Sequence, residues 1–159
     1  MTLVQKKLET QIGPMFLIVS EKGLRGLLWK KQNVPFNPGS EKIEALLLKV
    51  EQEITEYLSG NRKSFSIPLD VEGTEFQKRV WNELAKIPYG ETKSYKEIAM
   101  ALKDANACRA VGTANGRNPV SIIVPCHRVI AASGKLAGYA GGIEVKKALL
   151  AIEGLSLRE

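Results

Sequence analysis

The sequence predicts a small α/β domain followed by a mostly α-helical domain. Up to residue 60, two apolar runs are separated by a turn signal and followed by one long helical pattern. After residue 72, two capping-box patterns open shorter helices instead. A length of 159 residues suits one ordinary domain or two small ones. We expect a boundary in the polar stretch between the two patterns, which gives domains 1–68 and 69–159.

The first domain is expected to contain a strand hairpin and a helix. Residues 15–19 form an apolar run between turn signals, and residues 24–29 provide its hairpin partner. A loop with two prolines covers residues 33–39. Ser40 can cap the following helix, whose apolar residues recur at helical spacing until Gly60 ends it. This half of the sequence offers few candidate catalytic residues.

The second domain is expected to consist of short helices. The pattern Thr-x-x-Gln at residues 74–77 and the pattern Ser-x-x-Glu at residues 94–97 are capping boxes. A short polar turn precedes a third helix at residues 107–114, and the last helix covers residues 143–153. Two short helices joined by a tight turn resemble a helix-turn-helix.

Net charge differs between the two halves of the chain. Residues 1–72 carry a net charge of +1 and residues 73–159 carry +5. A basic half indicates a polyanionic partner, although a solvated basic surface explains the charge equally well. The sequence contains no run of about 18 apolar residues, so no membrane span is expected. The N-terminus lacks the apolar core of a signal peptide. We therefore expect a cytoplasmic protein that does not bind membranes.

The residues that carry chemistry follow a continuous apolar run. Residues 120–124 should form a buried strand or extended segment that leads directly to Cys126 and His127. A cysteine needs a base, a cation or a helix N-terminus to become a good nucleophile. Adjacent side chains of an extended segment point to opposite faces, so these two need a turn or a bridging water. Glu153 and Glu144 are the candidates to orient the histidine. For an isolated cysteine, a buried structural thiol is the ordinary interpretation.

The helix at residues 107–114 is unusually rich in small residues. Long polar side chains read base edges in the major groove, whereas a slim helix suits a minor groove about 6 Å wide. Packing of the small face inside the protein is the alternative, and spacing alone does not separate the two. Cys108, at the start of this helix, is interpreted as a structural residue, and Tyr89 and Trp81 are interpreted as packing residues.

A set of motifs in fixed order resembles the O6-alkylguanine-DNA alkyltransferases. The resemblance is strong over residues 73–155, whereas the N-terminal half matches only in kind. The matching segments are Ile87-Pro88-Tyr89-Gly90-Glu91-Thr92, Ser94-Tyr95, Arg109-Ala110-Val111-Gly112, Asn118-Pro119, Ile122-Ile123-Val124-Pro125-Cys126-His127-Arg128-Val129-Ile130, Ser133-Gly134, Gly138-Tyr139-Ala140-Gly141-Gly142, Lys146 with Leu149-Leu150, and Glu153-Gly154.

The resemblance implies a fold, a reaction and a partner. It implies a ribonuclease-H-like N-terminal domain and a winged-helix or helix-turn-helix C-terminal domain. The expected function is DNA repair by irreversible transfer of an alkyl group from O6-alkylguanine to the protein's own Cys126, once per molecule. The expected partner is double-stranded DNA bound through its minor groove with base flipping, by a monomer that needs no cofactor.

The resemblance also implies the catalytic residues. Cys126 would be the acceptor thiolate, and His127 would act as its base through a water molecule while Glu153 orients the ring. Tyr95 would help to rotate the nucleotide and would donate to guanine N3. Asn118 would brace the turn before the reactive cysteine.

Further residues would bind the substrate. Arg109 would fill the space left by the flipped base, and its helix, including Gly112, would lie in the minor groove. The carbonyl of Val129, with that of the reactive cysteine, would accept from the guanine amine. Tyr139 would form a wall of the pocket, and the backbone N–H of Ala140 would donate to O6.

Some positions lie at the edge of the resemblance. Gln77 and Lys96, near helix starts, are candidates for phosphate contacts. Ala140 stands where several members of the family have serine, so no hydroxyl is present there. We expect no metal site, because residues 1–72 contain neither cysteine nor histidine and the chain has two Cys and one His in total. A disulfide framework is not expected either.

Two other functions remain as alternatives. A helix-turn-helix regulator with an inert buried cysteine would need long side chains to read the major groove, which the Ala- and Gly-rich helix supplies poorly. A cysteine hydrolase would turn over repeatedly and would usually take its base from a distant histidine, which this chain lacks.

Overall fold

A computed structural model describes residues 2–156 of the chain, which divide into two compact units between Glu72 and Gly73. We call them the N-terminal unit and the C-terminal unit. Among the described residues, every helix is too short or too polar to cross a membrane.

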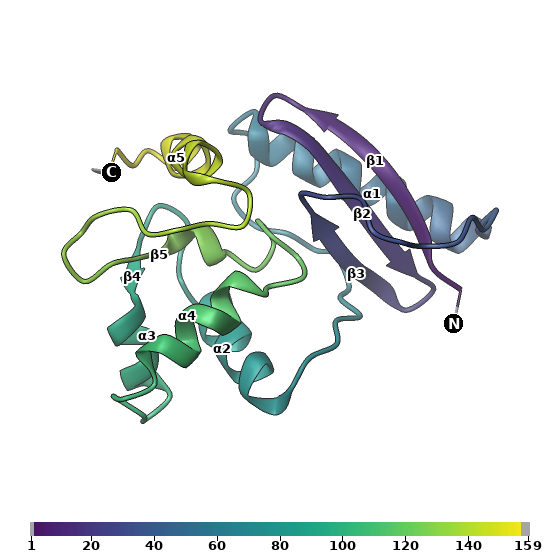
Figure 1. Cartoon of the computed structure of the whole chain (residues 1–159). Helices are drawn as coiled ribbons and strands as arrows, with labels where there is room; N and C mark the ends of the chain where they lie inside the picture. The colour runs from purple at the N-terminus through teal and green to yellow at the C-terminus, as the bar shows by residue number, and fades with distance from the viewer. Residues whose placement is uncertain (1, 157–159) are drawn as a thin grey trace. The chain divides into compact units, whose positions relative to one another are not determined.

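The N-terminal unit is a three-stranded antiparallel sheet with one long helix against it (Figure 1). The strand order is β1-β2-β3, and helix α1 contacts β1 and β2. The hairpin and the helix predicted from the sequence are both confirmed. The elements are β1 (Val4–Thr10), β2 (Gly13–Ser20), β3 (Gly23–Leu28) and α1 (Glu41–Leu58).

Strand β1 was not expected from the sequence. It lies at an edge of the sheet, paired only with β2, and its residues are exposed or half-buried. Lys6 and Lys7 lie near its centre, and lysines are common on edge strands because they discourage pairing with another chain. The same lysines weaken the apolar alternation by which a strand is recognised.

Helix α1 begins and ends at the predicted signals. The Ser40 side chain accepts a hydrogen bond from the Ile43 N–H at 3.2 Å. After Leu58, Gly60 takes a positive φ of 82° that favours glycine. Val50 and Ile54 are fully buried in the core of the unit, which the helical spacing of the apolar residues predicts.

The segment after Ile67 stays with the N-terminal unit because it runs beside β3. The Leu24 N–H donates to the Pro68 carbonyl at 2.8 Å, and the Asp70 N–H donates to the Leu24 carbonyl at 2.9 Å. A Cβ at Gly23 would lie 2.6 Å from the Pro68 carbonyl oxygen, so only glycine fits there. These bonds hold residues 69–72 to the sheet, and the units therefore divide after residue 72.

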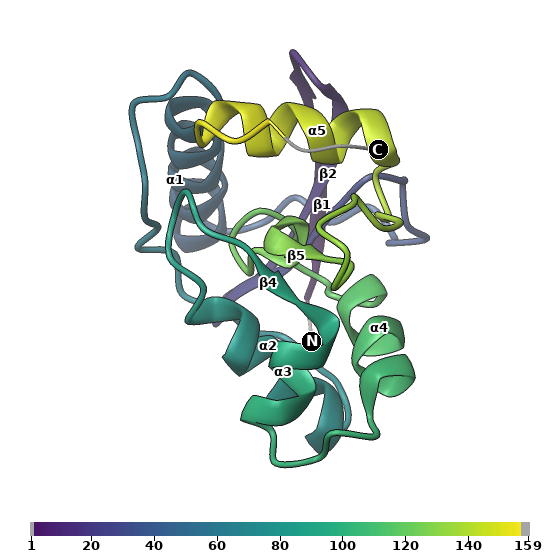
Figure 2. The same cartoon turned by 90° about the vertical axis from the view of Figure 1, so that its left-hand side faces the viewer.

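The C-terminal unit packs short helices around a two-stranded parallel pair (Figure 2). Helices α2, α3 and α4 contact one another, and α5 contacts η1. This mostly helical arrangement confirms the predicted fold class. The elements are α2 (Glu75–Ala85), β4 (Lys93–Ser94), α3 (Tyr95–Ala101), α4 (Cys108–Gly116), the 3₁₀ helix η1 (Cys126–Arg128), β5 (Val129–Ile130) and α5 (Ile143–Ile152).

Both predicted capping boxes are present. Thr74 and Gln77 satisfy each other's backbone N–H groups at the start of α2, and Ser94 and Glu97 do so at the start of α3. Trp81 packs in the core, as predicted, and its indole N–H donates to the Ala114 carbonyl at 2.9 Å. Helix α2 is thereby fixed against α4.

The prediction of a strand or extended segment at residues 120–124 is wrong. The chain turns there, with the Val124 N–H donating to the Val120 carbonyl at 3.0 Å. Ile122 has a φ of 75°, a left-handed conformation that is rare for a β-branched residue. The segment is nevertheless apolar because it is buried: Val120 and Ile122 are each 1% exposed. Burial, not strand pairing, explains its composition.

Candidate active site

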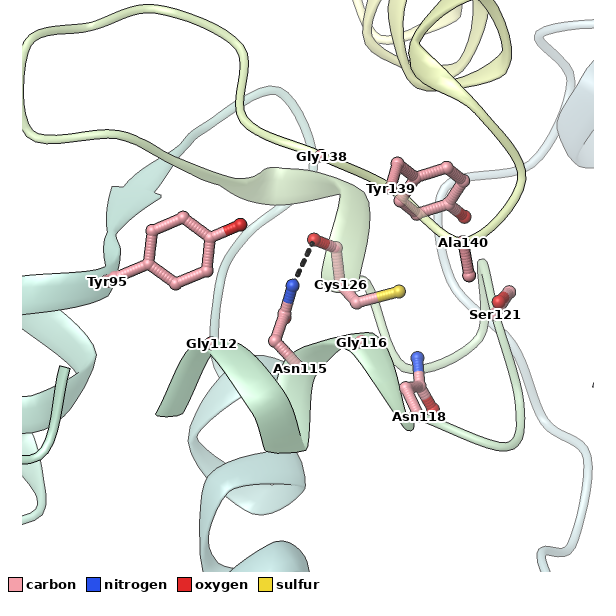
Figure 3. Close-up of a pocket in the computed structure, with 10 residues that line it drawn as sticks. All are labelled: Tyr95, Gly112, Asn115, Gly116, Asn118, Ser121, Cys126, Gly138, Tyr139 and Ala140. Atoms are coloured by element: carbon pink, nitrogen blue, oxygen red, sulfur yellow. Dashed lines mark hydrogen bonds between the residues drawn. The ribbon is translucent and has the colours of Figure 1, made fainter. Parts of the chain in front are cut away.

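A cavity of about 320 Å³ opens in the C-terminal unit around Cys126 (Figure 3). Helix α4 forms one side of it, and the segment Gly138–Ala140 lies on the other side of the cysteine. The residues that line the cavity are Tyr95, Gly112, Asn115, Gly116, Asn118, Ser121, Cys126, Gly138, Tyr139 and Ala140.

Asn118 fixes the turn that leads to the cysteine. Its side-chain amide donates to the Val124 carbonyl at 2.7 Å, and its side-chain oxygen accepts from the Val120 N–H at 3.0 Å. The residue is 5% exposed, so these bonds replace water for buried backbone groups. The turn then passes into η1, which begins at Cys126.

The Cys126 side chain is a buried thiol that faces the cavity. Burial raises the pKa of the Cys126 thiol, because the thiolate loses its hydration. Hydrogen bonds with the side chains of Asn118, Tyr139 and Ser121 lower the pKa, but they offset the effect of burial only in part. The resting group is a thiol that needs a proton acceptor before it can attack.

Behind the cysteine lies a buried chain of polar groups. The His127 Nε2 atom is 2.7 Å from one carboxylate oxygen of Glu153. Arg128 donates to both oxygens of the same carboxylate, at 2.8 and 3.1 Å. The Gly90 N–H also donates to Glu153, at 2.9 Å. Glu153 thus joins the loop after α2, the helix η1 and the end of α5.

These contacts keep Glu153 ionised. Burial alone would favour the protonated acid, but the hydrogen bonds from His127 and Arg128 outweigh it and lower the pKa of Glu153 to about 2. An ionised carboxylate only accepts hydrogen bonds. The His127 nitrogen that faces it must therefore carry the proton.

His127 itself is neutral and keeps one ring nitrogen that can accept a proton. Burial lowers the pKa of His127, and the contact with Glu153 opposes this only in part. With Nε2 donating to the carboxylate, the lone pair of the neutral ring lies on Nδ1. The geometry resembles the pairing of a base with an orienting acid in nucleophilic enzymes.

Two family models match the chain. The DNA-binding domain of the 6-O-methylguanine DNA methyltransferases matches residues 75–155, and the ribonuclease-like domain of the same proteins matches residues 3–71. A methylated-DNA–protein-cysteine methyltransferase of Methanosarcina acetivorans is 49% identical over 92% of this chain and 95% of its own length. This chain belongs to the O6-alkylguanine-DNA alkyltransferase family.

Solved structures of the family agree with the fold. The O6-methylguanine methyltransferase of Mycobacterium tuberculosis is 42% identical, covers 96% of this chain and 93% of its own, and has a TM-score of 0.84. The same protein has been solved in complex with DNA, at 41% identity, with 97% of this chain and 93% of that chain covered and a TM-score of 0.84.

Most residues expected in this family's site lie together here. Cys126, Tyr95, Asn118, Gly112, Tyr139 and Ala140 line one cavity, and His127 and Glu153 are hydrogen-bonded behind it. Val129 follows η1 and is fully buried. Burial raises the pKa of Tyr95, so its hydroxyl stays protonated and can donate a hydrogen bond.

Besides His127, Glu153 and Val129, three of the expected residues do not line the cavity. Arg109 and Lys96 are exposed, near the starts of α4 and α3. Gln77 is half-buried, and its side-chain oxygen accepts from the Thr74 N–H at 2.9 Å. All three roles are proposed for DNA contacts, which lie outside the cavity.

The burial of two cationic side chains was not predicted from the sequence. Arg128 is 6% exposed and Lys146 is 0% exposed. A signal for Lys146 existed: it is spaced three residues from Ile143 and from Leu149, which places it on the apolar face of its helix. Asn115 and Ser121, which line the cavity, were also missed.

Glu144 is exposed in the first turn of α5, whereas Glu153 is the acid that is hydrogen-bonded to His127. Tyr89 packs as expected, with its ring under the Arg128 guanidinium at 5.7 Å and its hydroxyl donating to the Ile152 carbonyl. In the described residues, no group of three or more His, Cys, Asp or Glu side chains is placed to hold a metal ion.

Proposed function

We propose that this chain repairs O6-alkylguanine in double-stranded DNA by taking the alkyl group onto its own Cys126. One observation carries the proposal: the thiol in the cavity is followed directly by a histidine whose ring is held by a buried, ionised glutamate. This arrangement makes a thiolate on demand. The cavity beside it has the size of a small-molecule pocket.

The reaction is a single displacement. His127 accepts the Cys126 proton through a water molecule, and the sulfur attacks the alkyl carbon on O6. A sulfur–carbon bond forms while the carbon–O6 bond breaks, and its electron pair leaves with guanine, which takes up a proton. The thioether product contains no bond that water can readily cleave, so each molecule reacts once. No cofactor enters the balance.

The base must leave the duplex to react. Cys126 is 2% exposed inside the cavity, so its sulfur does not reach a base within the stack. Arg109 is exposed on α4 and would fill the gap in the duplex. The exposed residues beside it on this helix are mostly small, including Ala110, Thr113 and Gly116, which supports close approach to a minor groove.

Residues around the cavity would then hold the flipped guanine. Tyr95 would donate to N3, and the Ala140 N–H would donate to O6 as the leaving base gains charge. Tyr139 would cover the ring, and the Val129 and Cys126 carbonyls would accept from the exocyclic amine. Every one of these groups comes from one chain, which supports a monomer as the active form.

Contacts to the DNA backbone come from residues outside the cavity. Lys96 near the start of α3 and Gln77 near the start of α2 are proposed to contact phosphates. Substitution of Lys96 should weaken binding of any duplex equally, because phosphate contacts carry no sequence information.

Intact-mass measurement tests the function. After incubation with a duplex containing O6-methylguanine, the protein should gain about 14 Da (one CH₂) stoichiometrically and irreversibly on Cys126. Cys108→Ser should gain the same mass, whereas Cys126→Ser should gain none. An unmodified duplex provides the second control. A folded protein that binds DNA but keeps its mass would instead favour the helix-turn-helix regulator, and repeated turnover would favour a hydrolase.

A further inference from the structure

No step of the proposed reaction uses residues 87–92, although this motif belongs to the family resemblance. The segment links α2 to β4 and reaches the C-terminal end of α5 (Figure 2). It contains a turn, because the Glu91 N–H donates to the Pro88 carbonyl at 3.1 Å. Gly90, the third residue of this turn, has a φ of 81°. A positive φ at the third position is characteristic of a type II turn.

The type of turn decides which way its central peptide group points. Between a type I and a type II turn, this group rotates by about 180°. In the type II turn observed here, its N–H group belongs to Gly90 and donates to Oε1 of Glu153 at 2.9 Å. In a type I turn, the carbonyl of Tyr89 would take the place of this N–H group. A carbonyl cannot donate to a carboxylate, so the bond depends on the turn type.

Four hydrogen bonds hold the Glu153 carboxylate. Oε1 accepts from the Gly90 N–H and, at 2.8 Å, from Nε of Arg128. Oε2 is bonded to Nε2 of His127 at 2.7 Å and to Nη2 of Arg128 at 3.1 Å. An ionised carboxylate has about four acceptor sites, so these bonds fix both its position and its plane. The Gly90 bond is the one of these four that comes from the backbone.

Without the Gly90 bond, two of the three remaining bonds would come from Arg128. A charged arginine that donates twice holds a carboxylate more strongly than a neutral imidazole does. The carboxylate would then settle against the guanidinium, and its bond to His127 would lengthen. We propose that Gly90 is a positioning residue for alkyl transfer, whose type II turn aims the backbone N–H at Glu153 and so keeps the carboxylate in line with His127. This inference rests on the proposed function.

A side chain at Gly90 has room, but few residues have the required backbone conformation. A Cβ there would lie 3.5 Å from the backbone carbonyl oxygen of Glu153, which is an ordinary contact. The positive φ is the constraint: asparagine adopts it more readily than most residues, alanine adopts it less readily, and for a β-branched valine it is an outlier. Asn, Ala and Val at this position should therefore favour the type I turn in increasing order.

The test is single-turnover alkyl transfer at pH 7 in Gly90→Asn, Gly90→Ala and Gly90→Val. Gly90→Val should lower the maximal rate about 10-fold, because a misplaced group slows a reaction strongly even when it lies away from the reacting atoms. Gly90→Asn should stay within about twofold of the wild type, and Gly90→Ala should lie between the two. The duplex concentration that gives half the maximal rate should not change, since neither Gly90 nor Glu153 lines the cavity.

Gly60→Val is the matched control. Gly60 has nearly the same φ, 82°, and a Cβ there would meet nothing within 4 Å. The residue follows α1 in the N-terminal unit, so the substitution introduces the same backbone strain away from the active site. Its transfer rate should equal that of the wild type, while thermal unfolding should show a loss of stability comparable to that of Gly90→Val.

The histidine ring reports directly on the position of the carboxylate. His127 is the only histidine of the chain, so its ring N–H signal in a proton NMR spectrum is identified without further assignment. The bond from Nε2 to a buried carboxylate moves this signal downfield and protects the proton from exchange with water. The signal should persist in the wild type, in Gly90→Asn and in Gly60→Val, and it should move upfield or disappear in Gly90→Val. A change confined to stability would leave it unmoved.

Each other outcome overturns the inference. Equal rates in Gly90→Val and Gly60→Val would show that the turn does not affect transfer. A rate of Gly90→Asn as low as that of Gly90→Val would exclude the backbone conformation as the cause, and a low rate with an unmoved His127 signal would exclude a shift of the carboxylate. If Gly90→Val does not fold, Gly90→Ala and Gly90→Asn are compared by the same criteria. A wild-type protein that gains no mass would refute the proposed function, whereas the NMR comparison needs no DNA and still tests the position of Glu153.

Discussion

Within residues 2–156, each unit buries one glutamate, and the two are used differently. Glu53 in α1 is 4% exposed and accepts from the Ser66 N–H and hydroxyl at 2.9 and 2.7 Å. Glu153 after α5 is 6% exposed and accepts from His127, Arg128 and Gly90. In both residues burial opposes ionisation, hydrogen bonds outweigh it, and the pKa is lowered. The two glutamates are thus alike in burial and in charge.

The partners make the difference. Glu53 binds a serine and lies 3.6 Å from Arg62, which is partly exposed, so it fastens one loop to one helix. Glu153 binds a fully buried histidine and an almost fully buried arginine, from a segment next to the reactive thiol. A buried carboxylate therefore indicates chemistry when its partners are themselves buried and ionisable. Substitutions at the two sites can separate stability from activity.

The largest effect is expected for Glu153→Gln. The change leaves the buried Arg128 guanidinium without its counter-charge, which should lower the free energy of unfolding by about 3 kcal/mol. His127 also loses the acceptor that fixes its tautomer, so alkyl transfer should slow by about 100-fold. Urea unfolding and single-turnover transfer at pH 7 measure the two effects. A rate within twofold of the wild type would remove Glu153 from the mechanism.

Acid should weaken the protein through the same residue. The pKa of Glu153 is lowered from 4.5 to about 2, so its contribution is fully present above pH 4.5 and is lost as the pH falls through 2. This loss amounts to about 3 kcal/mol. The pKa of His127 is also lowered from 6.5, which makes stability decline from below pH 6.5 in the same direction.

Urea unfolding between pH 7 and pH 2 measures this dependence. The curve of Glu153→Gln should be flatter than that of the wild type, and the two should approach each other near pH 2. Parallel curves over the whole range would show that Glu153 is not the group that titrates.

How far the sequence predicts the molecule depends on whether the signal is local. Helix caps at Ser40, Thr74 and Ser94 were found correctly, because a cap depends on residues three or four positions apart. The turn at Ile122 was missed because a buried apolar run with β-branched residues also suits a strand, although the resemblance did imply that Asn118 braces a turn before the cysteine.

The site shows the same limit. Family motifs identify Cys126, His127 and Glu153, but Lys146 and Arg128 become noticeable only when burial is known. A charged side chain looks solvated in a sequence, and whether it is buried depends on segments that fold over it. Strand β1 was missed because its exposed lysines interrupt the apolar alternation by which a strand is recognised.

A moderate effect is expected for Glu53→Gln. The amide keeps one acceptor for Ser66 but loses the charge that strengthens both bonds, so the free energy of unfolding should fall by about 1–2 kcal/mol. The transfer rate should equal that of the wild type, because Glu53 belongs to the N-terminal unit whereas the residues of the active site belong to the C-terminal unit. A rate loss as large as that of Glu153→Gln would end the distinction between the two glutamates.

The smallest effects come from two matched helix caps, Ser40→Ala in the N-terminal unit and Ser94→Ala in the C-terminal unit. Each removes one hydrogen bond to a backbone N–H, of 3.2 Å and 3.0 Å, and each should cost about 1 kcal/mol of stability. Ser94 also precedes Tyr95, so loosening its cap should displace the tyrosine from the cavity and slow transfer several-fold. Ser40→Ala should leave the rate unchanged. Equal rates in both variants, with equal losses in melting temperature, would show that the capping box of α3 serves stability alone and that Tyr95 is held by its packing.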